Sequence, residues 1–204
     1  MKMSDTITNN LEFENNNYLI VRNLWDVTEL KCDPPEERGV LIQYENGVIF
    51  DTVDEGQVNG STSRGNYPAY KHIHTSIRHK IEDLIGKKLY NTYYFDRFYF
   101  NGQCLKKHTD RDSCEISVTL HVGTNLSKPA SDWPVCIQTP DERDVCVILN
   151  PGDAMLYKGV NALHWRDKMP DDMDGGYYHQ IFFHYVLQDG CRSHHAWDRL
   201  RSVS

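Results

Sequence analysis

The chain has 204 residues, of which 39% are hydrophobic and 11% aromatic, and its formal net charge is −7. This length and hydrophobic content favour a single domain, residues 1–204, with a substantial core, and argue against a disordered chain. The negative charge gives no electrostatic reason to bind nucleic acid or an anionic membrane, and no apolar run approaches the ~20 residues that span a bilayer.

The first segment, residues 1–17, is polar and rich in asparagine, so we expect a frayed N-terminus. It also lacks the apolar stretch of a secretory signal. Together with the absence of a spanning segment, this predicts a cytoplasmic protein.

Residues 41–53 predict a β-hairpin, because two apolar segments flank Asn46-Gly47, the dipeptide that favours a tight hairpin turn. Residues 54–68 follow as a stretch rich in Gly, Ser and Asn. Such a stretch is either a mobile lid or a long connection, and we expect a connection.

Residues 72–86 predict an amphipathic helix. Ile73, Ile77 and Ile81, followed by Leu84 and Ile85, recur at helical spacing, and the glycine at position 86 ends the pattern. The three histidines of this segment do not share one ligand face, so we interpret them as packing or solvent-facing residues.

From residue 88 onward the pattern is that of short β-strands separated by turns such as residues 150–153, Asn-Pro-Gly-Asp. This spacing predicts an antiparallel sandwich or barrel rather than alternating βα units. The expected fold is therefore mainly β with flanking helices around a jelly-roll core. The predicted strands are 88–100, 115–122, 134–139, 144–150, 154–159 and 177–186.

The six cysteines are spaced ten or more residues apart, and no CxxC pair occurs. This excludes a zinc ribbon or a thioredoxin-like motif. In a cytosolic protein we expect reduced, mostly buried thiols rather than a disulfide framework. The cysteines are Cys32, Cys104, Cys114, Cys136, Cys146 and Cys191.

The sequence contains no GxSxG, GxGxxG or P-loop motif. Carboxylate pairs such as Asp171-Asp172 lie in polar loops, and we expect them to face water. The candidate chemistry is left to histidines. His108-Thr109-Asp110 precedes a predicted strand, and an imidazole and a carboxylate two positions apart on a strand can face one ion.

A third ligand is needed on a neighbouring strand, and His164 is the candidate, because it follows a Pro-Gly-Asp turn and a predicted strand. Two histidines and one carboxylate form the facial triad of non-haem Fe(II) oxygenases, which leaves three metal positions open. A lone histidine is more often a packing residue, so the hypothesis depends on the three residues occurring together.

The combination "YFNGQCLKKHTD … ISVTLHV … NPGDAMLYKGVNALHW … YYHQIFFHYV" resembles the double-stranded β-helix (cupin-like) core of Fe(II)/2-oxoglutarate-dependent dioxygenases, most of all the prolyl 4-hydroxylase-like branch. The resemblance covers roughly residues 88–190. It implies that His108, Asp110 and His164 bind Fe(II). It also implies that 2-oxoglutarate and O₂ are co-substrates, and that a prolyl residue in a peptide or protein, or a free proline-like molecule, is hydroxylated with release of succinate and CO₂.

The family also holds the distal carboxylate of 2-oxoglutarate with a cation, commonly at the start of the last strand. This sequence departs from that pattern, because the last strand begins "YYHQ". Arg166 is the substitute we expect, ahead of a surface ion pair, because it lies two positions after His164 and a guanidinium matches a carboxylate. Lys158 is a weaker candidate. Neutral donors that could line the pocket are Tyr99, Ser117, Thr119, His121, Tyr178, Gln180 and His184.

Two alternatives stay open. The missing cation on the last strand favours a catalytically inactive cupin-like binding module. The ligand types alone are also compatible with a zinc hydrolase.

Overall fold

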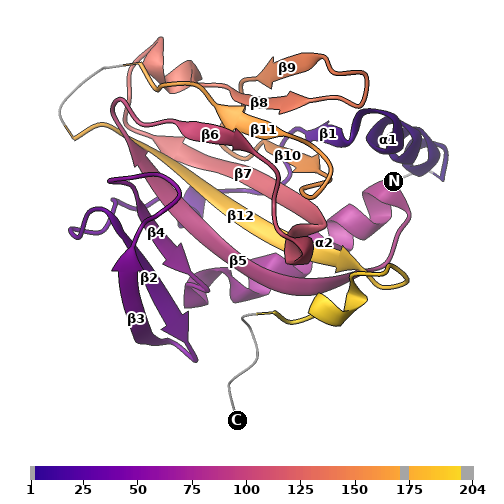
Figure 1. Ribbon diagram of the computed structural model, residues 1–204, viewed down its shortest axis with the longest axis horizontal. Helices are drawn as coiled ribbons and strands as arrows, with labels where there is room; N and C mark the ends of the chain where they lie inside the picture. Colours follow the sequence, from indigo (N-terminus) through magenta and orange to yellow (C-terminus); the bar gives the residue numbers. More distant parts are fainter. Residues whose placement is uncertain (1–2, 171–174, 199–204) are drawn as a thin grey trace.

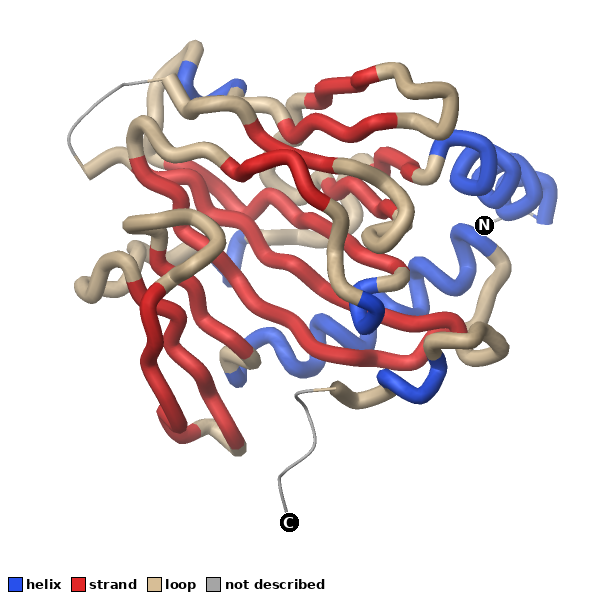
Figure 2. The backbone as a smooth tube through the Cα atoms, in the orientation of Figure 1, coloured by secondary structure: helices blue, strands red, loops and turns tan. Residues whose placement is uncertain are grey.

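The computed structural model describes residues 3–170 and 175–198, so the acidic pair Asp171-Asp172 lies outside the described residues. The described chain is mainly β. A large sheet of eight strands carries a smaller sheet of four strands, which lies in front of its upper part in Figure 1. Figure 2 shows the same two layers of strand, with a helix behind the large sheet.

The large sheet has the strand order β1-β10-β7-β12-β5-β4-β2-β3, and the small sheet has the order β6-β11-β8-β9. All neighbouring strands are antiparallel except β2 and β4. The large sheet comprises β1 (Tyr18–Val21), β2 (Val40–Glu45), β3 (Val48–Asp54), β4 (Thr62–Gly65), β5 (Leu89–Phe100), β7 (Ile116–Thr124), β10 (Ala154–Tyr157) and β12 (Tyr177–Leu187). The small sheet comprises β6 (Leu105–His108), β8 (Val135–Gln138), β9 (Asp144–Val147) and β11 (His164–Arg166).

This arrangement is the double-stranded β-helix that was expected, with helices added outside the two sheets. The α-helices among the described residues are α1 (Met3–Asn16) and α2 (Lys71–Ile85). Short 3-10 turns connect the elements at Thr28–Leu30, Pro68–Tyr70, Asp112–Cys114, Ala130–Asp132 and Ser193–His195. None of the described helices is long and apolar enough to cross a membrane.

Helix α2 confirms the prediction for residues 72–86. Ile73, Ile77 and Ile81 are buried against the outer face of the large sheet, in one core with residues of β7 and β12. The helix ends at Gly86, which adopts a left-handed conformation (φ 66°) that glycine accepts without steric cost.

Helix α1 differs from the expected frayed N-terminus. Phe13 is completely buried in the α2 core, and Thr6 donates a hydrogen bond to the carbonyl oxygen of Asp83 (2.9 Å). Glu14 forms ion pairs with Lys87 and Lys158. These contacts are tertiary, which is why the polar sequence gave no local sign of them.

The hairpin around Asn46-Gly47 is confirmed as β2 and β3, and both turn residues have the positive φ of a tight hairpin turn (50° and 84°). The following segment is more than the expected connection. It contains β4, a short strand that is buried throughout and inserted between β2 and β5. The sequence did not indicate this strand, because Thr62–Gly65 (TSRG) contains no apolar side chain and its burial depends on both neighbouring strands.

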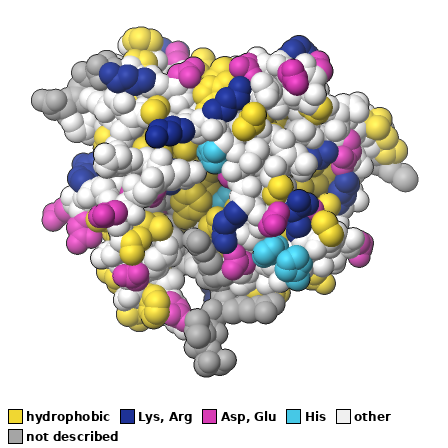
Figure 3. Space-filling view, viewed as in Figure 1, with side chains coloured by type: hydrophobic (Ala, Val, Ile, Leu, Met, Phe, Trp, Pro, Cys, Tyr) yellow, Lys and Arg dark blue, Asp and Glu magenta, His cyan; other side chains and the backbone are white. Residues whose placement is uncertain are grey.

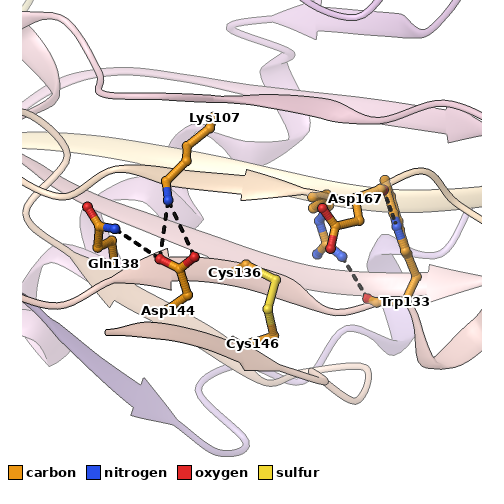
Figure 4. The surroundings of a disulfide bond; sticks show 8 residues. Lys107, Trp133, Cys136, Gln138, Asp144, Cys146 and Asp167 are labelled. Carbon is orange, nitrogen blue, oxygen red and sulfur yellow. Dashed lines mark hydrogen bonds and ion pairs between the residues drawn. A yellow bond between two sulfur atoms is a disulfide. The ribbon is translucent and has the colours of Figure 1, made fainter. Parts of the chain in front are cut away.

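The expectation of six reduced thiols is wrong for one pair. Cys136 on β8 and Cys146 on β9 are register partners with Cα atoms 4.0 Å apart, and they form a disulfide (Figure 4). The antiparallel hairpin places the two residues opposite each other, although they are ten positions apart in sequence. The free cysteines are Cys32, Cys104, Cys114 and Cys191.

The large sheet has two faces of different character. Its outer face packs on α2 through aliphatic and aromatic side chains and also holds the buried Arg64–Asp96 ion pair, to which His179 is bonded. Its inner face, toward the small sheet, carries alternate residues of β5 and β12, where Phe95 stacks on Phe182 (ring centroids 4.6 Å apart) and Tyr93 lies beside His184 (4.7 Å). The neutral polar candidates that the sequence suggested on β5, β7 and β12 lie on this inner face.

Candidate metal and 2-oxoglutarate site

His108, Asp110 and His164 meet between the two sheets. His108 ends β6 and His164 begins β11, and the two are direct register partners with ring centroids 4.3 Å apart. The Nε2 atoms of His108 and His164 lie 3.6 and 3.4 Å from Oδ1 of Asp110. One ligand atom from each residue lies within 4.8 Å of the others, so the three residues can hold one metal ion.

Asp110 reaches this position in a different way from the one expected. The strand ends at His108, so Asp110 is not on a common strand face with it. Its backbone N–H instead donates to the carbonyl oxygen of Gly159 (2.9 Å), and the hydroxyl of Ser117 donates to its Oδ2 (3.0 Å). The segment before β11 and the inner face of β7 thus fix the carboxylate.

The histidine tautomers are set by backbone carbonyls. Nδ1 of His108 lies 2.8 Å from the carbonyl oxygen of Lys106, and Nδ1 of His164 lies 3.0 Å from that of Ala162. A carbonyl only accepts, so each Nδ1 carries a proton and Nε2 is the ring nitrogen of each histidine that is left to face Asp110 and a metal. This is the arrangement that a metal-binding imidazole needs.

The charges of the three groups also suit a cation. Burial alone would raise the pKa of Asp110, but hydrogen bonding and charge from His164, with further charge from His184 and His108, lower it to about 2. Burial, and then the neighbouring His164, lower the pKa of His108. The site is therefore an ionised carboxylate with a neutral imidazole at His108. Two imidazole nitrogens and one carboxylate are a ligand set that fits Fe(II) with open positions.

Arg166 lies on the same buried side of β11 as His164, as expected, and is only 2% exposed. It donates hydrogen bonds to the carbonyl oxygen of Trp133 and to Oε1 of Gln180 (both 2.7 Å), and stacks on the rings of Trp133 and Tyr178. The expected alternative, a surface ion pair, is not formed with any described residue. Arg166 therefore places a cation from β11 beside the first residues of β12. The start of β12 itself has no lysine or arginine.

Two polar atoms beside Arg166 are buried and make no hydrogen bond within the described structure: the hydroxyl of Tyr178 and Nε2 of Gln180. A buried guanidinium without a carboxylate, next to two unused donors, is costly unless an anion binds there. This cluster fits the distal carboxylate of 2-oxoglutarate.

The remaining candidates form two groups, one beside Asp110 and one beside Tyr178 and Trp133. Ser117 and His184 lie beside Asp110 and are joined by a hydrogen bond (2.9 Å). His121 and Tyr99 lie at the other end, where His121 stacks on Tyr178 (4.1 Å) and Tyr99 meets Trp133 edge to face. Thr119 is buried between them on β7.

Lys158 is not part of the site. Its ammonium group forms an ion pair with Glu14 of α1 (2.6 Å). The candidate failed because its distance from His164 along the chain says nothing about which way its side chain points.

Sequence reasoning missed a second charged group beside the metal residues. Arg97, 3% exposed on the inner face of β5, forms an ion pair with Glu55 (3.0 Å) and donates to Oε1 of Gln57 (2.8 Å). Gln57 in turn contacts His108. The available signal was the alternation in "YYFDRFYF", where Arg97 occupies an inward position between Phe95 and Tyr99.

The face seen in Figure 3 is hollowed near its middle, with hydrophobic side chains inside the hollow and histidine side chains visible beside it. A cavity of about 270 Å³ is lined in part by Gln57 and Arg97. Because Gln57 also contacts His108, this cavity lies next to the candidate metal ligands.

No protein-family model and no curated protein matches the sequence. Solved structures do match the fold. An oxidoreductase of the 2OG-Fe(II) oxygenase family from Burkholderia pseudomallei aligns with a TM-score of 0.64 at 12% identity, over 98% of this chain and 96% of that chain. The prolyl hydroxylase of Trichoplax adhaerens, solved with a peptide fragment of the hypoxia inducible factor oxygen degradation domain, gives 0.58 at 13% identity, over 91% and 94%.

HygX from Streptomyces hygroscopicus, solved with nickel, 2-oxoglutarate and hygromycin B bound, gives a TM-score of 0.59 at 11% identity, over 91% of this chain and 87% of that chain. The chain therefore has the double-stranded β-helix fold of the 2OG-Fe(II) oxygenases, prolyl hydroxylases among them. The matched structures hold different molecules: a peptide fragment in the Trichoplax adhaerens protein and hygromycin B in HygX.

Proposed function

We propose that the chain is an Fe(II)- and 2-oxoglutarate-dependent dioxygenase that hydroxylates a prolyl residue in a peptide or protein, or a free proline-like molecule, with succinate and CO₂ as co-products. His108, Asp110 and His164 would hold the iron. Arg166, Tyr178 and Gln180 would hold the distal carboxylate of 2-oxoglutarate.

The observation that carries the proposal is the presence of two incomplete sites on the same buried side of β11. The triad offers two imidazole nitrogens and one carboxylate oxygen. Two positions after His164, Arg166 has no carboxylate partner among the described residues, and Tyr178 and Gln180 beside it have unused polar atoms. A metal with open positions and a buried cation for an anion are what this pair of co-substrates requires.

The chain's own groups would then bind and orient the reactants. When bound, the iron and 2-oxoglutarate supply the oxidising chemistry. Asp110 contributes the negative charge that the cation needs, and the carbonyls of Lys106 and Ala162 hold the two imidazoles in the ligating tautomer. The aromatic floor formed by Phe95 and Phe182 keeps water from the pocket.

The test is anaerobic titration of the metal-free protein with Fe(II) and 2-oxoglutarate, followed by a succinate-release assay against prolyl peptides and free amino acids. We expect the weak visible charge-transfer band of the Fe(II)–2-oxoglutarate complex, and we expect His164→Ala to abolish it. Metal uptake without the band favours a zinc hydrolase. Absence of both metal uptake and band favours a binding module.

Arg166→Ala tests the carboxylate anchor. Loss of a charge-assisted hydrogen-bonding partner weakens binding by about 10- to 100-fold, so we expect that drop in 2-oxoglutarate affinity with metal affinity retained. Arg143→Ala, an exposed arginine on the β8–β9 turn, is the control. Unchanged 2-oxoglutarate affinity in Arg166→Ala would exclude the assignment.

A further inference from the structure

Gln57 connects the metal residues to the neighbouring cavity. It lies exposed in the segment between β3 and β4, and its side-chain Nε2 is 3.0 Å from Nε2 of His108. Its Oε1 accepts a hydrogen bond from Arg97 (2.8 Å). One amide group therefore bridges a metal residue and a buried cation.

The contact with His108 uses the atom that a metal would need. Nδ1 of His108 is committed as a donor to the carbonyl oxygen of Lys106, so Nε2 has only a lone pair. The amide N–H of Gln57 donates to that lone pair. Metal binding to His108 and this hydrogen bond consequently exclude each other.

The other end of Gln57 is firmly held. Arg97 is fixed by Glu55 and by the hydroxyl of Ser63 (3.1 Å), and the backbone N–H of Gln57 donates to Glu55 (3.1 Å). When a metal takes His108, the amide of Gln57 is still anchored through its Oε1. Its N–H group is then free to donate to another acceptor.

That acceptor would lie in the cavity of about 270 Å³ that Gln57 lines. Tyr93 and Phe95 form an aromatic wall, and Gln43 adds an amide that lies directly against Gly65, where any Cβ would clash with it at 2.3 Å. The charged pair of Arg97 and Glu55 is internally balanced. Aromatic faces, amides and no net charge suit a peptide main chain better than a free amino acid, whose two charges would lack partners.

The cavity continues into a larger groove of about 940 Å³, with which it shares Leu41, Gln43, Asn66 and Tyr94. The groove follows the β2–β3 hairpin. Its lining includes two carboxylates, Glu45 and Asp51, and one lysine, Lys71. A neutral or basic extended peptide would therefore complement it.

We propose that Gln57 is a positioning residue that couples metal binding to peptide binding. Without metal its amide N–H is bonded to His108, and with metal bound the same N–H donates to a main-chain carbonyl of a peptide in the cavity. This inference rests on the proposed function, because it assumes that the triad binds metal.

The test measures binding rather than turnover. Mn(II) affinity is determined for the wild type, Gln57→Ala and the control Gln138→Ala, a half-buried glutamine on β8 whose amide contacts Asp144. Removal of one competing hydrogen bond predicts about three- to tenfold tighter Mn(II) binding in Gln57→Ala. A merely structural role of Gln57 would weaken metal binding instead.

The second readout is binding of an acetylated, amidated Lys-flanked proline peptide, and of free L-proline, with and without Mn(II). We expect wild type to bind the peptide at least about threefold more tightly with Mn(II), and Gln57→Ala to lose that gain. Equal Mn(II) affinity in wild type and Gln57→Ala overturns the coupling. So does peptide binding that is absent, independent of Mn(II), or no tighter than that of free proline.

Failure of the proposed function would look different, since Mn(II) would then bind wild type and His164→Ala equally weakly.

Discussion

At the scale of single residues, the metal site depends on how closely the backbone approaches Asp110. Gly159, between β10 and β11, accepts the backbone hydrogen bond of Asp110 and lies against its side chain. A Cβ at Gly159 would be 2.5 Å from Oδ2 of Asp110 and 2.3 Å from the carbonyl oxygen of Cys114. Both distances are too short for a methyl group at Gly159.

Gly159→Ala should therefore displace Asp110 and weaken metal binding by at least about tenfold, the loss expected when a ligand or its support is disturbed. Isothermal titration with Mn(II) measures this. Gly123→Ala is the matched control, because an added Cβ there meets only the flexible side chain of Lys31 at 3.9 Å. Equal loss in both variants would mean that the effect is general destabilisation.

Residue type and spacing, together with the family resemblance, singled out His108, Asp110 and His164, and the structure brings these three residues within reach of one ion. The contacts of Gly159 and Gln57 with them could not be predicted, because each contact joins distant segments of the chain. Lys158 was a wrong candidate for the same reason: its partner Glu14 is far away in sequence.

At the scale of elements, α2 is tied to the large sheet by a buried histidine. His74 is 1% exposed among Tyr94, Phe183 and Tyr185, and its Nε2 lies 3.0 Å from the carbonyl oxygen of His184. Burial lowers the pKa of His74 to about 3, and the nearby charges of His184 and Arg78 act in the same direction.

Because an unfolded histidine has a pKa of about 6.5, the unfolded chain takes up this proton first as the pH falls. The contribution of His74 is complete above about pH 6.5 and is lost progressively down to about pH 3, at up to about 1.4 kcal/mol per pH unit. Urea unfolding of wild type should lose about 2 kcal/mol more between pH 6 and 4.5 than that of His74→Gln.

His72→Gln, an exposed position on the same helix, is the control and should follow wild type. Identical pH dependence in wild type and His74→Gln would contradict the assignment. Other buried groups, such as His121, titrate in the same way in all three proteins and cancel in the comparison.

The elements themselves were predictable where the pattern is local. Periodic isoleucines predicted α2, and Asn46-Gly47 predicted the β2–β3 hairpin. Helix α1, strand β4 and the Cys136–Cys146 disulfide were missed, because each depends on contacts with distant segments. The strand predicted at residues 154–159 ends at Tyr157 as β10. Strand β11 begins only at His164, and an irregular segment that contains Gly159 lies between the two.

At the scale of the whole molecule, the three candidate metal ligands lie between the two sheets. The small sheet supplies His108 and His164, whereas Asp110 is held by Ser117 of the large sheet and by Gly159 beyond β10. A bound ion would add a tie between the layers that the unfolded chain does not have. Binding to the folded state alone raises stability in proportion to the logarithm of ligand concentration.

Mn(II) and 2-oxoglutarate, each at a concentration near 100 times its Kd, should therefore raise the free energy of unfolding. One ligand at that concentration contributes about 2.7 kcal/mol. For a chain of this size that energy raises the Tm by about 5–10 °C, measurable by calorimetry. Asp110→Asn should lose the shift, since it removes the charged ligand. Asp144→Asn, at an exposed aspartate of β9, should keep it. A shift that survives in Asp110→Asn would place the metal outside the triad.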